Sequence, residues 1–339
     1  MHYKMLLWPH ANARYQSETV KLATAELELM LARFAPGAQI VADERMGMPG
    51  LDINMDGPLD DGAVLALRRH SLLYGLFEDR DGLLSPVAGR RDAALGWDLP
   101  AILKYKGKTN ELFLQLLINT ALYSGAFWQA EGPLALLDPM CGRATGLFVA
   151  ANYGWDAVGA DVDRGDLKEA EQFFRRYLEY HRFKHTVTRL SRTLKRGGSA
   201  AECRFEYAPD AHVPRRTLSL VCMDAANAEG ALGRNACHVV ACDLPYGVRH
   251  DARMDRGIAP KGNWLEALLA RALPAWKTAL KPGGAMALSF NAQNMKRERL
   301  RELMAQAGLE VLEGGPYDGF AHWVEQAITR DIAVCRKPL

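Results

Sequence analysis

The sequence lacks the features of membrane, secreted and disulfide-framed proteins. No run of about 18 consecutive apolar residues occurs, so we expect no transmembrane helix and no membrane partner. The first fifteen residues carry one lysine and a short apolar run, too weak a pattern for a signal peptide. The six cysteines include no C-x-x-C pair, which favours buried thiols in a reducing compartment over a disulfide frame or a zinc site. We therefore expect a cytoplasmic protein without a structural metal.

The length and charge distribution indicate two dissimilar parts. A chain of 339 residues is long enough for about two domains of roughly 150 residues each. Its 49% hydrophobic and 24% charged residues exclude a disordered chain. The first 95 residues contain 10 Lys and Arg against 13 Asp and Glu, whereas the whole chain has a net charge of +2. The positive charge therefore lies in the remainder.

Residues 1–90 show strand and helix signals in the order β-α-β-β-α-β. This order is typical of a ferredoxin-like domain. An apolar helical spacing covers 17–34, and Asp60 or Asp61 can cap a second helix reaching about Phe77. The expected strands are 3–8, 38–41, 51–55 and 82–87. We expect a connecting segment over 91–108.

From residue 109 to 339, strands and helices alternate. This pattern predicts a Rossmann-like domain with a mainly parallel sheet covered on both faces. The expected strands are 134–138, 157–162, 218–223, 238–242, 285–290, 310–312 and 331–335. The expected helices are 110–123, 142–152, 167–180, 264–280 and 296–307. No internal repeat is present.

A glycine-containing turn follows the first strand of this domain. The segment runs Asp138-Pro139-Met140-Cys141-Gly142 and continues to Gly146. Glycines let a backbone approach a ligand closely, and a helix start offers free N–H groups. The segment lacks the G-K-[ST] of a P-loop and the full G-x-G-x-x-G of dinucleotide folds. A structural turn is the alternative interpretation.

Acids also follow the next two strands. Asp161 and Val162 follow the second strand. In Rossmann-like domains, an acid about 20 residues after the turn that follows the first strand can bind ribose hydroxyls. Asp163 can instead cap the following helix. Asp224 and Ala225 follow the third strand and could face an adenine ring. Together these residues favour an adenosine-containing ligand.

The most specific motif is Asp243-Leu244-Pro245-Tyr246-Gly247, at the end of a fourth strand. Ligands bind at the carboxyl edge of such sheets. The Asp243 carboxylate and the carbonyl groups of the turn can accept hydrogen bonds from a planar amino group, and the Tyr246 ring can stack on a flat substrate. The alternative is a proline-aromatic turn that packs on the core.

The segments DPMCGRATG, GADVD, VCMDAA and DLPYG, in this order, resemble class I S-adenosylmethionine-dependent amino-methyltransferases. D-P-x-C-G-x-x-T-G together with D-[LP]-P-[YF]-G looks most like tRNA guanine-N2 methyltransferases that carry a THUMP domain. The resemblance covers about 100–339 and implies a seven-stranded methyltransferase sheet. It implies S-adenosylmethionine as the cofactor and an exocyclic amine as the methyl acceptor. The N-terminal part is too short for a complete THUMP domain.

The resemblance also implies roles for individual residues. The catalytic residues would be Asp243, Leu244, Pro245 and Tyr246. Thr109, in a segment similar to the family's methionine-side motif, would contact the cofactor. The other implied cofactor residues are Asp138, Met140, Cys141, Gly142, Gly146, Asp161, Val162, Asp224, Ala225 and Asp243.

A basic insertion over 181–216 is the candidate RNA-binding segment. It contains nine Lys and Arg against three acids, with Phe183, Phe205 and Tyr207 interleaved. Basic residues bind phosphates and aromatic rings stack on bases, although a solvated basic loop is the alternative. Lys195-Arg196-Gly197-Gly198 could form a hairpin tip. The candidate substrate-binding residues are Arg192, Lys195, Arg196, Arg249 and His250.

Three alternatives to a tRNA methyltransferase remain open at this point. A DNA adenine or cytosine amino-methyltransferase shares the chemistry, and so does a protein glutamine or small-molecule N-methyltransferase. A non-catalytic RNA-binding or scaffold protein is the third. The acidic N-terminal part is expected to pack on the catalytic domain or to contact a second copy or a small partner subunit. We expect tRNA or another structured RNA to be the main partner.

Overall fold

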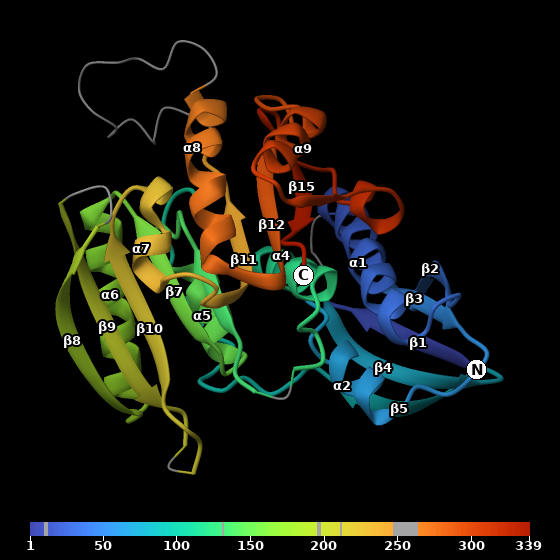
Figure 1. Cartoon of the computed structure of the whole chain (residues 1–339). Helices are drawn as coiled ribbons and strands as arrows, with labels where there is room; N and C mark the ends of the chain where they lie inside the picture. Colours follow the sequence, from blue (N-terminus) through green and yellow to red (C-terminus); the bar gives the residue numbers. More distant parts are fainter. Residues whose placement is uncertain (10–12, 131, 195–197, 211, 247–263) are drawn as a thin grey trace. The chain divides into compact units, whose positions relative to one another are not determined.

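The computed structural model describes residues 1–9, 13–130, 132–194, 198–210, 212–246 and 264–339. The chain divides into two compact units, and each is described by itself. Unit 1 comprises 1–92 and 313–332, and unit 2 comprises 93–312 and 333–339. The C-terminal part of the chain therefore contributes to both units, as the colours along the sequence show (Figure 1).

Unit 1 contains a five-stranded sheet with the order β2-β3-β1-β4-β5. The pairs β1–β3, β1–β4, β2–β3 and β4–β5 are all antiparallel. Its strands are β1 (His2–Leu7), β2 (Gln39–Arg45), β3 (Met48–Asn54), β4 (Leu73–Arg80) and β5 (Leu83–Gly89). Its helices are α1 (Ala13–Phe34) and α2 (Asp61–Leu67), followed near the C-terminus by η2 (Gly315–Asp318).

The segment 313–332 completes unit 1 by packing on α1. Phe320 is fully buried, and the Lys21 ammonium group donates a hydrogen bond to the Ala321 carbonyl over 2.6 Å. A Cβ added at Gly319 would lie only 3.0 Å from the Ala25 Cβ, so the two segments approach closely. Strand β14 (His322–Glu325) then pairs antiparallel with the start of β15 (Ile328–Arg336). Residues more than 280 positions apart thus share one hydrophobic core.

The expected helix from Asp60 to Phe77 is wrong. Asp60 does cap α2, accepting from the Ala63 N–H over 2.7 Å, but the helix ends at Leu67. Residues 73–80 instead form β4, which pairs with β1 and in which Leu73 and Leu76 are fully buried. Tertiary pairing has overridden the local helical spacing here. The strand expected at 82–87 is β5, which pairs with β4 at the edge of the sheet.

The second sheet contains ten strands within the described residues, with the order β13-β15-β12-β11-β6-β7-β10-β9-β8 and β14 paired to β15. The resemblance implied seven strands. The difference arises because the basic insertion forms an antiparallel hairpin on the sheet edge and because β14 extends β15. The strands are β6 (Ala135–Asp138), β7 (Asp156–Asp161), β8 (Lys184–Thr193), β9 (Ser199–Ala208), β10 (Arg216–Cys222), β11 (Cys237–Asp243), β12 (Leu280–Asn291) and β13 (Glu310–Leu312).

The centre of this sheet is parallel, as the alternation of strands and helices predicted. The pairs β10–β7, β7–β6, β6–β11 and β11–β12 all run in the same direction. The chain order reverses at β6, since β7 and β10 follow on one side and β11 and β12 on the other. In open α/β sheets, such a switch point is where ligands bind, at the carboxyl ends of the strands.

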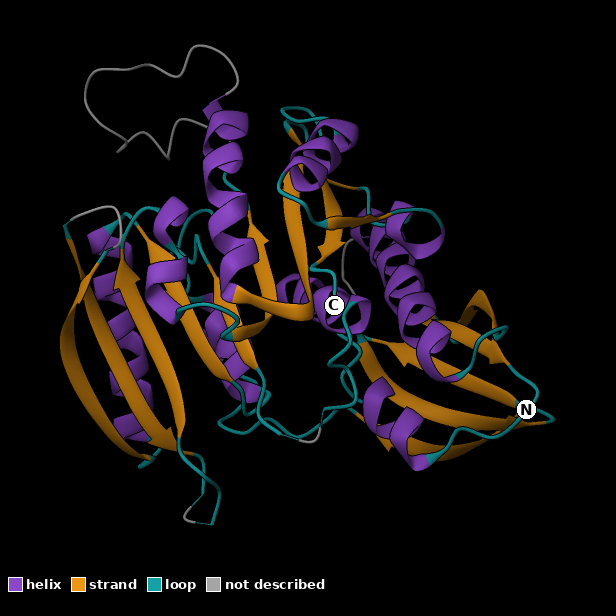
Figure 2. Ribbon diagram, in the orientation of Figure 1, coloured by secondary structure: helices purple, strands orange, loops and turns teal. Residues whose placement is uncertain are grey.

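Helices flank both faces of the strands of unit 2 (Figure 2). One face carries a large buried cluster in which Trp276, Leu269 and Met286 are fully buried. The helices are α3 (Leu99–Ile102), α4 (Glu111–Ser124), α5 (Thr145–Asn152), α6 (Arg164–Tyr180), η1 (Ala225–Asn227), α7 (Glu229–Leu232), α8 (Trp264–Ala279) and α9 (Arg297–Gln306). Among the described residues, no helix is both long and apolar enough to cross a membrane.

Candidate active site

Four strands bring one aspartate each to the same edge of the sheet in unit 2. Asp138, Asp161 and Asp243 are the last residues of β6, β7 and β11, and Asp224 follows β10 by two positions. Because these strands are adjacent and parallel, their carboxyl ends lie side by side. This edge contains the candidate site.

The turn after β6 is tight and leaves room beside its glycine. Gly142 has a φ of +48°, in the left-handed region, and a Cβ built there meets no atom within 4 Å. The Gly142 N–H donates to the Asp161 carboxylate over 2.8 Å, and the Cys141 N–H donates to the Ala160 carbonyl over 2.9 Å. The turn is therefore fixed against β7 while open space adjoins Gly142, as a ligand-binding turn requires.

Close packing under this turn depends on another glycine. A Cβ on Gly159 of β7 would lie 2.6 Å from both the Cys141 Sγ and the Leu147 Cδ1. Burial raises the pKa of the Cys141 thiol well above its usual value, so this cysteine is no activated nucleophile. Cys141 therefore serves as a small packing residue beneath the turn.

Asp138 is buried, and burial raises its pKa to about 8. The negative charges of Asp161 and Asp243 act in the same direction, while a hydrogen bond from the Met140 N–H at 3.2 Å opposes the rise. Gly146 lies against this carboxyl group, since a Cβ there would be 3.2 Å from Oδ2. Asp138 thus contacts both ends of the turn, at Met140 and at Gly146, from its buried side.

The Asp161 carboxylate lies beside the glycine turn. It accepts from the Asp163 N–H over 2.9 Å as well as from Gly142, and its pKa is raised, mainly by burial. The next residue, Val162, is 55% exposed, which is unusual for an apolar residue directly after a core strand. Asp163 caps α6 by accepting from the Gly165 N–H over 2.7 Å, as the alternative interpretation proposed.

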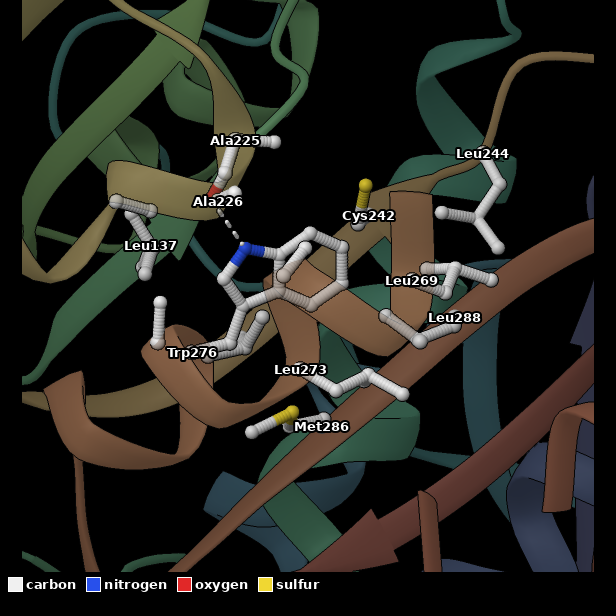
Figure 3. Close-up of a cluster of buried hydrophobic side chains, with 14 of the residues drawn as sticks. Leu137, Ala225, Ala226, Cys242, Leu244, Leu269, Leu273, Trp276, Met286 and Leu288 are labelled. Atoms are coloured by element: carbon white, nitrogen blue, oxygen red, sulfur yellow. Dashed lines mark hydrogen bonds between the residues drawn. The ribbon is translucent and has the colours of Figure 1, made fainter. Parts of the chain in front are cut away.

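Asp224 and Ala225 lie just after β10, at the same edge of the sheet. The Asp224 carboxylate accepts from the Ala226 N–H over 2.8 Å, and its side chain remains 40% exposed. The Ala225 carbonyl accepts a 2.9 Å hydrogen bond from the buried indole of Trp276 on α8 (Figure 3). The hydrophobic core therefore fixes this turn directly.

The Asp243 carboxylate is held by two hydroxyl groups. Thr109, just before α4, donates to Oδ2 over 2.5 Å, and Tyr246 donates to Oδ1. Each carboxylate oxygen has a second lone pair beyond the one used here. Asp243 is half-buried rather than turned into the core. The contact between Thr109 and Asp243 was not part of the sequence-based interpretation, which assigned Thr109 to the cofactor.

The turn after Asp243 is fixed on both sides. The Leu244 side chain is buried and its N–H donates to the Ser289 carbonyl over 2.9 Å. The Asn294 side-chain amide donates to the Tyr246 carbonyl. No described residue donates a hydrogen bond to the Leu244 carbonyl. The Leu244 carbonyl and the Asp243 carboxylate therefore stand next to each other as two acceptors at the end of β11.

Of the five expected substrate-binding residues, only Arg192 lies within the described residues. Arg192 is engaged within the protein: its guanidinium donates to the buried Glu202 carboxylate and, at 3.5 Å, to the Gly230 carbonyl. Lys195, Arg196, Arg249 and His250 lie outside the described residues. Pro245 and Met140 are half-buried at the site edge.

Sequence reasoning missed two residues that support the site. Asn294 lies 48 positions after Tyr246, and no local pattern connects the two. Arg143 forms ion pairs with Asp166 and Glu169 and lies 4.5 Å from the centre of the Tyr105 ring. A charged residue inside the glycine turn was the available signal for Arg143. Among the described residues, no group of three or more His, Cys, Asp or Glu could hold a metal.

Comparisons with known proteins give structural similarity only. No protein-family model matches the chain, and no curated protein matches it. The structure is similar to TrmN from Thermus thermophilus, with a TM-score of 0.46 and 14% identity over 99% of both chains. It is also similar to a methyltransferase from Pyrococcus furiosus, with a TM-score of 0.43 and 16% identity over 70% of this chain and 89% of that one.

A third similar structure is the 16S rRNA methyltransferase RsmC of Thermus thermophilus, solved with AdoMet and guanosine. The TM-score is 0.38 and the identity 13%, over 90% of this chain and 59% of RsmC. Because these scores and identities are low, we infer function from the residues of the site.

Proposed function

We propose that this chain is an S-adenosylmethionine-dependent methyltransferase that acts on an exocyclic amine of RNA, most specifically the N2 of a guanine in tRNA. The observation that carries this proposal is the pair of acceptors at the end of β11. The Asp243 carboxylate is fixed by two hydroxyl groups, and the adjacent Leu244 carbonyl has no donor among the described residues. Two adjacent acceptors match the two hydrogens of a planar amino group.

The residues along the neighbouring strand ends fit an adenosyl cofactor. Open space adjoins Gly142, the Asp161 carboxylate lies beside it, and the exposed Val162 side chain offers an apolar surface for a purine ring. Asp224, which is 40% exposed, can accept from an adenine amino group. When bound, the cofactor supplies a methyl group on a sulfonium, which is a good leaving group.

The proposed chemistry depends on positioning. The lone pair of a guanine amine is delocalised into the ring, so the nitrogen is a poor nucleophile. Hydrogen bonds from this amine to Asp243 and to the Leu244 carbonyl orient the lone pair toward the methyl carbon, which is the main catalytic contribution. In that position the bound cofactor would supply the methyl group to the amine and would itself become a neutral thioether. The Asp243 carboxylate is placed to take the proton that the amine then releases.

The choice of tRNA guanine rests on the DLPYG and DPMCG motifs and their resemblance to that family. A paired guanine must leave its base stack before it reaches Asp243, which costs a few kcal/mol. Tyr246 would stack on the extruded base while its hydroxyl keeps Asp243 in place.

We also propose that the N-terminal part is a ferredoxin-like module over 1–90, joined to the catalytic domain by 91–108. Support comes from the strand order β2-β3-β1-β4, which is the order that a split β-α-β arrangement gives. Its surplus of acids disfavours phosphate binding, so we assign it to contacts with protein, either a second copy or a partner subunit.

The test is methyl transfer from labelled cofactor to separate pools of tRNA, DNA duplex and protein. We expect label in tRNA, and nucleoside analysis then identifies the base. Asp243→Ala should abolish transfer while cofactor binding, measured by equilibrium dialysis, is retained. Label in DNA or protein, or transfer that survives Asp243→Ala, would contradict the proposal.

A further inference from the structure

The basic residues of the hairpin and its neighbouring helix fall into two groups that the sequence does not separate. Arg175 and Arg189 both form ion pairs with Glu171 of α6, at 3.0 and 2.7 Å. Arg192 and Arg204 both pair with Glu202, whose side chain is fully buried. These arginines hold β8, β9 and α6 together. Each of these arginines is already in an ion pair, so its charge is partly compensated and attracts a phosphate less strongly than an unpaired cation does.

The second group lies at the other end of the hairpin. Arg182, Lys184 and Arg215 are exposed, and no described residue forms an ion pair with any of them. The register places them together, since Lys184 pairs with Ala208 and Arg216 pairs with Tyr207 at the same edge of the sheet. The uncompensated cations of the described hairpin therefore gather at this edge.

Aromatic rings accompany these cations. Tyr180 is 82% exposed and lies edge-on to the His181 ring, with 5.0 Å between ring centres. His181 also contacts Tyr177 at 4.3 Å and Phe183 at 6.0 Å. The Tyr177 hydroxyl donates to Asp98 over 2.8 Å, which fixes the base of the cluster. Exposed rings beside unpaired cations are the combination that binds single-stranded nucleic acid, through stacking and phosphate contacts.

The backbone of Arg182 adds an independent observation. Arg182 has a φ of +59° directly after the C-cap of α6, where glycine is the favoured residue. An arginine here costs folding stability relative to glycine. Backbone strain of this kind is found where a side chain has a role beyond folding.

We infer that the distal patch, formed by Tyr180, His181, Arg182, Phe183, Lys184 and Arg215, is a docking surface for an unpaired segment of the RNA substrate. This inference rests on the proposed function. Helix α6 has 17 residues and begins beside Asp161, so the patch lies about 25 Å from the candidate site. A folded RNA can reach both places, whereas a small molecule cannot.

The first experiment measures binding of the full-length protein to bulk tRNA over a salt series. Arg182→Ser and Lys184→Ser should each reduce the slope of log affinity against log salt by about 0.7–0.9, the effect of one lost phosphate contact. Arg234→Ser is the matched control. Arg234 is exposed at the same edge, beside the start of β11 and five strands from β8, so its slope should equal that of the wild type. Equal slopes for all four proteins would overturn the inference.

Two further variants separate docking from folding. Tyr180→Ala should weaken tRNA binding by roughly 5- to 100-fold through the loss of stacking. Arg182→Gly should weaken binding as Arg182→Ser does, yet keep or raise the Tm, because glycine suits the left-handed backbone. A lower Tm with unchanged binding would assign Arg182 to the fold and contradict a docking role.

The same variants distinguish this inference from the proposed function. If tRNA receives no methyl group but the patch variants still lose tRNA affinity, the docking surface stands and the proposed reaction fails. If tRNA is methylated and the patch variants bind it like the wild type, the reaction stands and the docking surface is wrong. An equal loss of affinity for a blunt DNA duplex would refute the assignment to unpaired RNA.

Discussion

Replacing Thr109 by valine tests whether this residue acts on Asp243 or on the cofactor. Valine has nearly the same shape but lacks the hydroxyl that donates to the Asp243 Oδ2 over 2.5 Å. Without this donor, the carboxylate loses one of the two hydroxyl groups that fix it and can rotate away from the amine. We therefore expect the rate of transfer to fall while cofactor affinity stays unchanged.

The magnitude follows from the type of hydrogen bond. A bond to a charged group contributes about 1.5–3 kcal/mol, and both partners are half-buried. Partial exposure to solvent reduces this to about 1–2 kcal/mol, which corresponds to a kcat lowered by about 5- to 30-fold. Thr109→Ser keeps the hydroxyl and should recover most of the rate.

The assay is single-turnover methyl transfer at saturating cofactor, together with dialysis against labelled cofactor. A variant in which Thr109→Val raises the cofactor Kd and leaves kcat intact would refute this reasoning and return Thr109 to the cofactor. A second check uses Asp243→Asn as the background. There, Thr109→Val should have little additional effect, because the carboxylate on which it acts is absent.

Three further predictions concern the support of the site. In the folded chain the pKa of Asp138 is about 8, against 3.8 in the unfolded chain. The free energy of unfolding should therefore fall as the pH rises between these two values. Asp138→Asn should accordingly have a higher Tm than the wild type near the upper pH value and a similar Tm near the lower one. Gly159→Ala forces a methyl group against Cys141 and should cost about 1–3 kcal/mol in denaturant unfolding, unlike the same change at Gly57, where an added Cβ meets no atom within 4 Å. Trp276→Phe leaves the Ala225 carbonyl without its indole donor, and should cost about 1–3 kcal/mol and weaken cofactor binding; unchanged dialysis would show that this turn does not depend on α8.

The strand-end motifs predicted most of the candidate site because they are local. A strand followed by an acid and a tight turn specifies its own geometry, so Asp138, Gly142 and Asp161 lie together at the expected edge. The cap role of Asp163 was also visible from its position before a helix. The predicted parallel centre of the sheet follows from the same alternation.

Features that depend on distant pairing could not be predicted in this way. Thr109 and Asp243 are 134 positions apart, and their contact arises only when α4 packs beside β11. The sequence predicted helix for residues 73–77 because β1, the strand that pairs with β4, lies far earlier in the sequence. The charge count of the insertion likewise concealed that Arg189, Arg192 and Arg204 form ion pairs with Glu171 and Glu202 in the folded state.

Unit 1 is made of two segments that are far apart in the sequence, which has a consequence for biosynthesis. Its first 92 residues leave the ribosome early, but the segment that completes their core, 313–332, is translated about 220 residues later. At about 5–20 residues per second, the nascent amino-terminal sheet waits roughly 10–45 seconds for the piece that covers α1. During that interval the apolar side of this helix is exposed to chaperones and to other nascent chains. A stop codon before residue 313 would therefore damage the beginning of the protein as well as its end.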